Sequence, residues 1–255
     1  SDIFYMKDKV SFEDIEKNFE KYEHIPFDRS SIQSSQIQTL YMDHDDVLWL
    51  GTYNGLERFD LKTGTITHYS IGTDIISSVF RDSRQRLWIG TFTGLYLCTD
   101  SDCQHTIGFH THQTSSFIGN EVIHSISEDS RGTIYAATDD GVWQYNEESG
   151  AFERCRLVPK GAPGSKGPVY HFIEDSGFYW LSAWGKGLVR IDPAHNGYEV
   201  HSLPDGRIYS LYNNFISTDY IAAGSKSGGI YVLNKKTKKV VSYQANHSFE
   251  GTLTN

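Results

Sequence analysis

The sequence predicts an all-β fold, and three observations support that class. The chain of 255 residues contains 14% aromatic residues, 23 glycines and only two methionines, a composition typical of β-structure. An aromatic residue recurs with similar neighbours at spacings of 39, 47, 45 and 40 residues. Each period holds short apolar segments separated by turn residues, enough for four strands. Four short strands in about 40 to 45 residues predict one blade of a β-propeller.

The recurring aromatic residues mark five copies of the repeat. They are Trp49, Trp88, Tyr135, Trp180 and Tyr220. A small residue follows each of them two positions later, which would let neighbouring blades approach closely: Gly51, Gly90, Ala137, Ser182 and Ala222. Rings of this size bury roughly 150–250 Å² each. We therefore predict that the five aromatic residues are structural anchors that fill the space between blades.

Each copy begins with an alternating segment, such as residues 37–42 or 122–127. In the first four copies a turn built on aspartate follows, because an Asx side chain folds back onto the local backbone. The anchor strand, a loop and a third strand come next, then a turn such as 60–64 and a fourth strand such as 65–69. Glycine opens the third strand at Gly55, Gly94, Gly141, Gly187 and Gly229.

The copies also predict the domain organisation. We expect five complete blades at residues 31–70, 71–112, 113–160, 161–202 and 203–255. Residues 1–30 are expected to be the last strands of a preceding blade, with residues 3–5 as its third strand and residues 19–25 as its fourth. Residues 11–19 also fit a helical turn. Partial blades at both ends indicate part of a larger propeller, for which we expect seven blades.

Composition excludes several classes of function. The net charge of −9 argues against nucleic acid as a partner of this segment. No stretch approaches the roughly 18 apolar residues of a membrane-spanning helix. Neither a signal peptide nor an initiator Met is recognisable, so we expect the chain to be an excised segment of a longer protein.

The three cysteines leave their pairing open. Cys98 and Cys103 flank a turn-like sequence, where a disulfide and two free thiols are equally consistent with the spacing. Cys155 would remain unpaired if they form a bridge. Together with His105, His110 and His112 they match no known zinc spacing. We therefore predict neither a metal site nor a cofactor.

Residues 48–60 read Leu-Trp-Leu-Gly-Thr-Tyr-Asn-Gly-Leu-Glu-Arg-Phe-Asp, and with their copies they resemble the two-component regulator propeller repeat. The resemblance extends from about residue 31 to the end and is strongest in the first two copies. A threonine three positions after the anchor fits the pattern in the first three copies, whereas Ala183 and Ala223 depart from it.

This resemblance implies the periplasmic sensor region of a hybrid two-component system of Bacteroides type. Such proteins join propellers to a membrane helix, a histidine kinase, a receiver and a DNA-binding module, and they switch on genes for glycan use. It implies an oligosaccharide as ligand and the remaining parent sensor kinase as partner. A second copy of the chain is a further candidate partner. The chain itself has no kinase histidine motif and no P-loop, so we expect it not to be an enzyme.

In a propeller, the loops between second and third strands gather on one face with the segments that lead into the first strands, and the concave surface there suits a ligand. Aromatic faces can cover the C–H face of a sugar while polar groups bind its hydroxyls. The candidate ligand-binding residues are Tyr53, Asn54, Phe92, Asp139, Trp184, Lys186 and Arg207. The alternative is that the aromatic tips wedge between blades and the charged residues are merely solvated.

Other features favour structural roles. The basic residues 235–239 are expected to form a solvated hairpin tip, and His171 a paired core group. Asp139 and Asp140 are expected to point apart, which argues against an acid–base pair. Two other classes of function remain open: a propeller-type polysaccharide lyase or glycosidase, and a protein-interaction or dimerisation scaffold.

Overall fold

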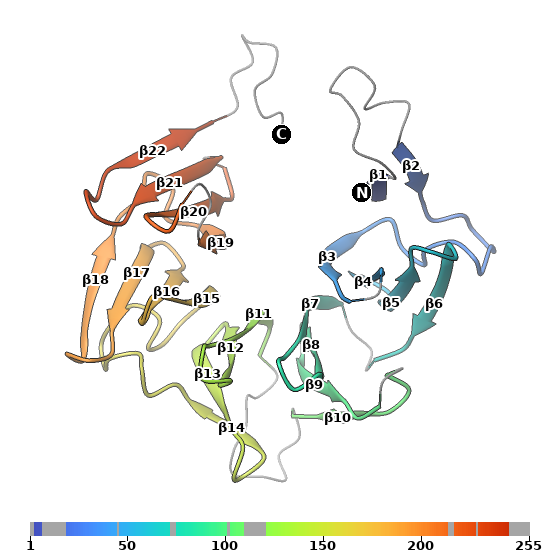
Figure 1. Cartoon of the computed structure of the whole chain (residues 1–255), viewed down its shortest axis with the longest axis horizontal. Helices are drawn as coiled ribbons and strands as arrows, with labels where there is room; N and C mark the ends of the chain where they lie inside the picture. The colour runs from blue at the N-terminus through green and yellow to red at the C-terminus, as the bar shows by residue number, and fades with distance from the viewer. Residues whose placement is uncertain are drawn as a thin grey trace. The chain divides into compact units, whose positions relative to one another are not determined.

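A computed structural model shows the fold of the chain (Figure 1). It describes residues 3–6, 19–44, 46–71, 75–100, 103–109, 121–213, 217–227 and 229–244. Every regular element in these ranges is a strand. These ranges accordingly contain no helix of the length and apolarity needed to cross a membrane.

The chain divides into two compact units, residues 1–108 and 109–255, which we call the first and the second unit. The first unit holds a two-stranded sheet and two four-stranded sheets among the described residues. Its strands are β1 (Ile3–Met6), β2 (Phe19–Tyr22), β3 (Ile37–Met42), β4 (Val47–Thr52), β5 (Gly55–Asp60), β6 (Thr65–Tyr69), β7 (Ile76–Arg81), β8 (Leu87–Thr91), β9 (Gly94–Cys98) and β10 (Thr106–Gly108).

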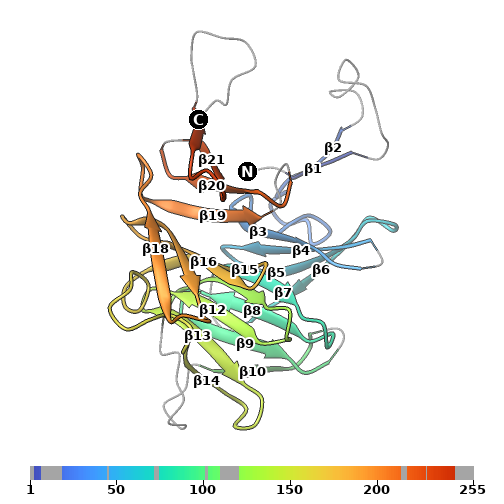
Figure 2. The same cartoon turned by 60° about the vertical axis from the view of Figure 1, so that its left-hand side comes forward.

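The second unit holds three four-stranded sheets in its described part (Figure 2). Its strands are β11 (Ile123–Glu128), β12 (Ile134–Thr138), β13 (Gly141–Asn146), β14 (Ala151–Arg154), β15 (Val169–Asp175), β16 (Phe178–Ala183), β17 (Gly187–Asp192), β18 (Gly197–His201), β19 (Ile208–Asn213), β20 (Tyr220–Ser225), β21 (Ile230–Asn234) and β22 (Val240–Tyr243).

Each four-stranded sheet is an antiparallel meander whose strands pair in chain order. The first strands of consecutive sheets lie side by side: β3 beside β7 in the first unit, and β11, β15 and β19 in turn in the second. This is the arrangement of propeller blades, and it confirms the predicted all-β propeller class. We number the blades 1 to 5 from β3–β6 to β19–β22.

Every blade carries a β-bulge at the same place, directly after the first residue of its first strand. The register shifts by one residue there in all five sheets. The residues inside the bulges are Gln38, Ser77, His124, Tyr170 and Tyr209. A bulge changes the direction of the side chain that it carries, so the residue at this position decides what each blade presents there.

The predicted anchors divide into four that are buried and one that is not. Trp49, Trp88, Tyr135 and Trp180 are at most 2% exposed. Trp49 and Trp180 each lie in an apolar cluster shared with the following blade. Tyr220 is only half-buried. It lies in blade 5, and no described strand follows that blade to cover it.

Blades 1 and 2 approach each other closely at Gly51. A Cβ atom added there would lie 2.8 Å from the carbonyl oxygen of Ile76, the first residue of β7. A contact this short leaves no room for a side chain. This close contact gives a physical reason for the small residue two positions after the anchor.

The aspartate that opens the turn after the first strand also bonds to the anchor. Trp49 Nε1 donates to Asp43 at 2.8 Å, Trp88 Nε1 to Asp82 at 2.8 Å and Tyr135 Oη to Asp129 at 3.0 Å. In each pair the aspartate lies six residues before the anchor. The turn role of these aspartates was predicted from the sequence, but this second bond was not.

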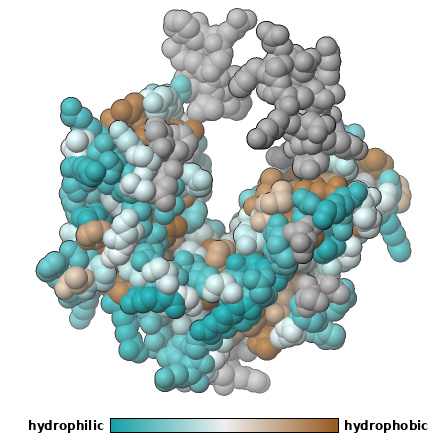
Figure 3. Space-filling model, in the orientation of Figure 1, coloured by the Kyte–Doolittle hydropathy of each residue, from teal (hydrophilic) through white to brown (hydrophobic). Residues whose placement is uncertain are grey.

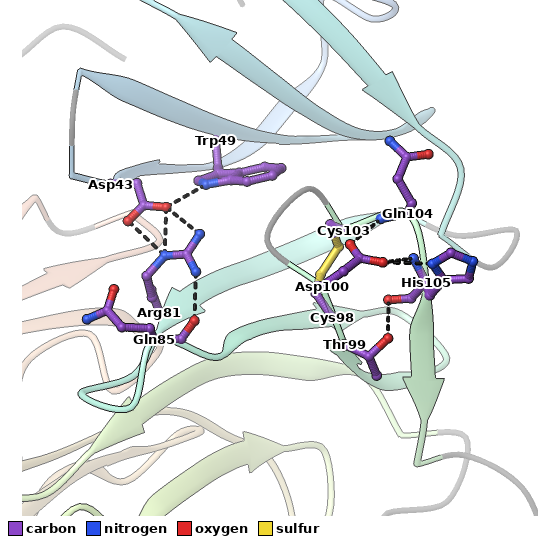
Figure 4. Close-up of a disulfide and its surroundings, with 10 residues drawn as sticks. All are labelled: Asp43, Trp49, Arg81, Gln85, Cys98, Thr99, Asp100, Cys103, Gln104 and His105. Atoms are coloured by element: carbon purple, nitrogen blue, oxygen red, sulfur yellow. Dashed lines mark hydrogen bonds and ion pairs between the residues drawn. A yellow bond between two sulfur atoms is a disulfide. The ribbon is translucent and has the colours of Figure 1, made fainter.

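Blade 4 breaks this pattern. Asp175 lies five residues before Trp180, and the buried Nε1 of Trp180 has no hydrogen-bond partner among the described residues. Asp175 instead accepts a 2.6 Å bond from Lys235 Nζ of blade 5. Asp43 keeps both roles, since Arg81 of blade 2 also donates to it at 2.7–2.9 Å (Figure 4).

Several predicted strands keep their bounds and others move. Residues 37–42 and 65–69 form β3 and β6 as expected, whereas β11 begins one residue late and β21 begins at Ile230 rather than Gly229. The strands β1 and β2 pair as a two-stranded sheet, with β2 ending at Tyr22, and their assignment to a preceding blade stays a prediction. Beyond β2 the Ile25 amide bonds to Ser31 Oγ and so belongs to a turn. The suggested helical turn lies outside the described residues except at Phe19, and the blade boundaries stay predictions.

The structure decides the cysteine pairing that the sequence left open. Cys98 and Cys103 form a disulfide with Cα atoms 4.8 Å apart, joining the end of β9 to the turn before β10 (Figure 4). His105 bonds to Asp100 at 2.7 Å beside it. Cys155 is a buried free thiol, and burial raises its pKa to about 11.

Polar residues dominate the described surface in the view of Figure 3, where hydrophobic residues form separate patches. The outermost strands carry some of the exposed apolar side chains. They include Tyr198 and Val200 of β18 and Val241 and Tyr243 of β22. Edge strands of this kind have one side without a neighbour in the sheet.

Candidate functional site

The loops between second and third strands lie beside the segments that lead into their own blades. The amide of Tyr53 donates to Gln36, that of Phe92 to Ile75 and that of Trp184 to Pro168, at 3.0–3.2 Å. In each case the acceptor carbonyl belongs to the residue directly before the first strand of the same blade. Loop tip and leading segment therefore share one end of blades 1, 2 and 4, as the sequence predicts for a propeller.

The predicted site residues of the first unit lie apart from other rings. Tyr53 is 41% exposed and Phe92 is 36% exposed. Neither ring contacts another aromatic ring in the part of the chain that the structure describes. The side-chain amide of Asn54 donates to the Gln33 carbonyl at 3.1 Å, which ties the loop to the segment that leads into the same blade.

A threonine fixes these tips in blades 1 to 3. Thr52, Thr91 and Thr138 each donate their hydroxyl at 3.0 Å to the carbonyl of the glycine three residues later. Each threonine oxygen also accepts the amide two residues on at 3.1 Å. The result is a tight loop of two residues between the second and third strands.

Blade 4 has a longer loop at the same position. Ala183 stands in place of threonine, and three residues, Trp184 to Lys186, separate β16 from β17. Gly185 adopts a φ of 69° and its amide donates to the Gly206 carbonyl at 3.0 Å. This loop therefore leans on the segment that leads into blade 5, and it carries Trp184 there.

Trp184 belongs to a group of four rings in the second unit, which we call the aromatic cluster: His124, Tyr170, Trp184 and Tyr209. Tyr170 is its centre. Its ring stacks on His124 with centroids 4.0 Å apart and lies 5.1 Å from Trp184 at an interplanar angle of 30°. Tyr209 meets Tyr170 edge-on at 4.8 Å and Trp184 at 5.7 Å.

The cluster draws on three blades. His124, Tyr170 and Tyr209 occupy the bulges of β11, β15 and β19, so three equivalent side chains are aimed alike. Trp184 joins them from the loop of blade 4. Tyr209 is 41% exposed, and Tyr170 and Trp184 are half-buried, so the cluster offers ring surface to a ligand.

Asp139 connects the predicted site to the far end of the cluster. One of its carboxylate oxygens lies 2.8 Å from His124 Nε2. Burial lowers the pKa of His124, although the bond to Asp139 opposes this. Burial raises the pKa of Tyr170, and the neighbouring Tyr209 and Asp139 raise it further. His124 and Tyr170 thus favour their neutral forms near pH 7.

Asp139 and Asp140 point to different partners, as expected for adjacent residues in a turn. Asp140 forms an ion pair with Arg154, whose guanidinium lies 4.4 Å above the ring of Trp143. Burial raises the pKa of Glu121, and the charges of Asp140 and Asp139 add to the effect. The carboxylates therefore gather at the His124 end of the cluster.

The remaining predicted site residues differ in their freedom. Lys186 is exposed and lines a pocket of about 390 Å³ together with Trp184. Arg207 is held in a network, since its guanidinium donates to Asp205 at 3.0 Å and to Ser227 Oγ at 2.6 Å. Lys186 is thus available to a ligand, and Arg207 mainly ties the leading segment of blade 5 to its loop.

His171 confirms its expected role as a paired core group. Its Nδ1 accepts the Leu211 amide of blade 5 at 3.0 Å. Burial lowers its pKa to about 4, so it stays neutral and can accept this bond. By contrast, the solvated hairpin predicted for residues 235–239 is wrong for Lys235. That lysine is drawn into the ion pair with Asp175, in which its side chain is only 13% exposed.

Trp184 and Asp139 are among the residues predicted from the sequence, whereas the three bulge residues beside them are not. These residues lie on strands, where an alternating pattern is normally attributed to the core. A usable signal existed in the repeat: the bulge residue lies eleven positions before the anchor, or ten in blade 4. Aromatic rings at this position in blades 3 to 5, against Gln38 and Ser77 in blades 1 and 2, would have indicated the cluster.

The described residues hold no group of three or more side chains suited to a metal ion. What the cluster offers is flat ring surface bordered by a carboxylate at one end and a lysine at the other. Such a surface can stack against the C–H face of a sugar and bind its hydroxyl groups.

Comparison with known proteins agrees with the repeat. Residues 31–54 and 70–93 each match the family model described as Two component regulator propeller. These segments are the beginnings of the first two copies. A search of curated proteins found no match.

Solved structures with the same fold include two extracellular domains assigned to hybrid two component systems of B. thetaiotaomicron. The domain of BT4673 has a TM-score of 0.73 and 21% identity, covering 92% of this chain and 31% of that one. The domain of BT3049 has a TM-score of 0.69 and 20% identity, covering 86% and 30%. Virginiamycin B lyase from Staphylococcus aureus has a TM-score of 0.61 and 12% identity, covering 83% and 70%. The chain thus spans about a third of the two extracellular domains.

Proposed function

Because two segments of the chain match the two-component regulator propeller repeat, we propose that the chain is an extracytoplasmic ligand-sensing segment of a hybrid two-component histidine kinase. Its ligand is an oligosaccharide, and binding is signalled through the membrane to genes for glycan use. The segment itself carries no catalysis in this proposal. It would lie in the periplasm as part of an inner-membrane sensor.

The observation that supports this proposal is the aromatic cluster. Three blades each contribute a ring to it, and its rings remain partly accessible. A structural wedge would be covered by the next blade, as the buried anchors are. Partly exposed rings next to hydrogen-bonding groups are what sugar recognition uses, since a pyranose has one apolar face and a polar rim.

Calorimetric titration of the chain with a panel of neutral and acidic oligosaccharides tests the proposal. We expect one class to bind and to raise Tm at saturating concentration. Trp184→Ala should weaken that binding at least tenfold with little change in Tm, because the ring is half-buried on a loop. Tyr53→Ala, the same repeat position in blade 1, should change the affinity less than twofold. Failure of every sugar to bind or stabilise the chain would contradict the proposal.

One observation supports a second candidate, a polysaccharide lyase or glycosidase. His124 is paired with Asp139 and stacked on Tyr170, so groups able to transfer protons lie together. Incubation of the chain with the polymers from which the panel derives tests this. New reducing ends or unsaturated products would favour the enzyme, and binding without turnover would favour the sensor.

A further inference from the structure

Two neighbouring pockets flank the loop of residues 161–166, which joins blade 3 to blade 4. One has a volume of about 390 Å³ and reaches Trp184 and Lys186. The other, of about 520 Å³, reaches Arg154 and Lys160. Both are lined by Gly161, Gly164, Ser165 and Lys166. Every charged side chain that lines either pocket is cationic.

Most of this positive charge is uncompensated. Arg154 is paired with Asp140, but the side chains of Lys160, Lys166 and Lys186 make no ion pair or hydrogen bond with any residue that the structure describes. In the hairpin after β21, three of the four lysines, Lys235, Lys236 and Lys238, pair with carboxylates. In a chain with a net charge of −9, three unpaired lysines around two neighbouring pockets form a local concentration of positive charge.

Trp184 joins these pockets to the aromatic cluster. It lines the first pocket beside Lys186, and it also contacts Tyr170 and Tyr209. The opposite end of the cluster carries Asp139 on His124. Lys186 therefore lies beside Trp184 at one end of the cluster and Asp139 lies beside His124 at the other, and an extended ligand would be oriented by this difference.

We propose that the ligand is an acidic oligosaccharide, one of whose rings lies on Trp184 while a carboxylate or sulfate group reaches Lys166 and Lys186. This inference rests on the proposed function and narrows its ligand class. An ammonium group is a compact charge on a flexible stem, and it binds carboxylate and sulfate oxygens without demanding one geometry. Neutral parts of the chain would extend toward Tyr170, because an acidic group there would meet Asp139.

Titration of the chain with three probes tests the proposal: an oligogalacturonate, a chondroitin sulfate oligosaccharide and a neutral xylo-oligosaccharide of similar length. We expect at least one acidic probe to bind ten times or more tightly than the neutral one. Raising the salt from about 20 mM to about 500 mM should weaken that binding several-fold, because salt screens exposed charges. The two acidic probes tell a carboxylate requirement from a sulfate requirement.

A charge-matched pair of double variants localises the effect. Lys166→Gln with Lys186→Gln should weaken acidic binding at least tenfold. Lys236→Gln with Lys238→Gln removes the same charge from the hairpin and should change affinity less than twofold. Equal losses in both variants would overturn the site, and equal binding of neutral and acidic probes would overturn the ligand class.

The outcomes separate this inference from the function on which it rests. Binding of the neutral probe that depends on Trp184 but not on the lysines would retain the sensor and overturn the acidic ligand. Absence of binding by all three probes at either salt concentration would contradict both. The Tm of each variant shows that a loss of binding is not a loss of folding.

Discussion

Blades 1 and 4 have the same four strands and differ at three equivalent places. Blade 1 has Gln38 in its bulge, a bond from Trp49 to Asp43 and a two-residue loop closed by Thr52. Blade 4 has Tyr170 in its bulge, an anchor without a hydrogen-bond partner among the described residues, and a three-residue loop that carries Trp184. The copy that follows the repeat builds scaffold, and the copy that departs from it supplies the centre of the candidate site.

The difference has a simple origin in chain length. The turn after the first strand is one residue shorter in blade 4, since Asp175 lies five rather than six positions before its anchor. The loop on the other side of the anchor strand is one residue longer. The blade keeps its strands, loses one internal bond and gains a ring beside Tyr170. Compared with blade 1, blade 4 thus has fewer polar bonds in its scaffold and more partly exposed aromatic surface.

The largest expected effect is a difference in stability between variants of Asp43 in blade 1 and Asp175 in blade 4. Asp43→Ala should lower the free energy of unfolding by about 3–5 kcal/mol, because it removes a buried acceptor from both Trp49 and Arg81. Asp175→Ala should cost about 1–3 kcal/mol less, since it leaves only Lys235 without its partner, whereas Asp43→Ala also leaves the Trp49 N–H without its acceptor. Urea unfolding of both variants measures the difference. Equal losses would show that the anchor bond contributes little.

The next largest effect is a difference between blades 1 and 4 in the pH range over which their titrating groups lose their contribution to stability. The pKa of His171 in blade 4 is lowered to about 4 in the folded chain, so its contribution is complete above pH 6.5 and is lost as the pH falls towards 4. Asp43 in blade 1, with its pKa lowered to about 2, loses its contribution only below about pH 3.8.

Between pH 6.5 and 4 the wild-type chain should therefore lose about 2–3 kcal/mol through His171. His171→Gln keeps a side-chain acceptor and should remove this part of the pH dependence. Denaturant unfolding at several pH values provides the measurement. An unchanged slope in His171→Gln would mean that other groups cause the loss.

The smallest effect on stability concerns the two anchors. Trp49→Phe removes an N–H that donates to a carboxylate, whereas Trp180→Phe removes an N–H without a partner. Both rings are 1% exposed, so the lost volume should cost similar amounts. Trp49→Phe should thus be the more destabilising by about 2 kcal/mol. If Trp180→Phe lowers the free energy of unfolding by the same amount, the missing anchor bond in blade 4 has no effect on stability.

Most of the scaffold could be predicted from the sequence, because the repeat shows the same residues five times. The anchors, the turn aspartates and the glycine at the start of most third strands all follow from that periodicity. The exception among the anchors is Tyr220, whose exposure depends on what lies next to blade 5 and not on its own copy. The disulfide remained open because a spacing of five residues suits a bridge and two thiols alike.

The candidate site was predicted only in part, for a physical reason. Tyr53, Phe92 and Trp184 occupy one repeat position, and their sequences give no sign that only the third meets other rings. That outcome depends on Tyr170 and Tyr209, whose direction is set by a bulge, and a bulge is a feature of strand pairing. Lys186 was identified by its place in the loop, whereas Lys160 and Lys166 needed the pockets to be seen.

We propose that departures from the repeat, and not the repeat itself, form the binding surface. Exchanging the bulge residues between the two blades tests this most directly, with calorimetric titration of the oligosaccharide that binds the wild-type chain. Tyr170→Gln should weaken binding at least tenfold without lowering Tm, and Gln38→Tyr should leave the affinity unchanged. Unaltered affinity in Tyr170→Gln, or a matching change in Gln38→Tyr, would contradict the claim.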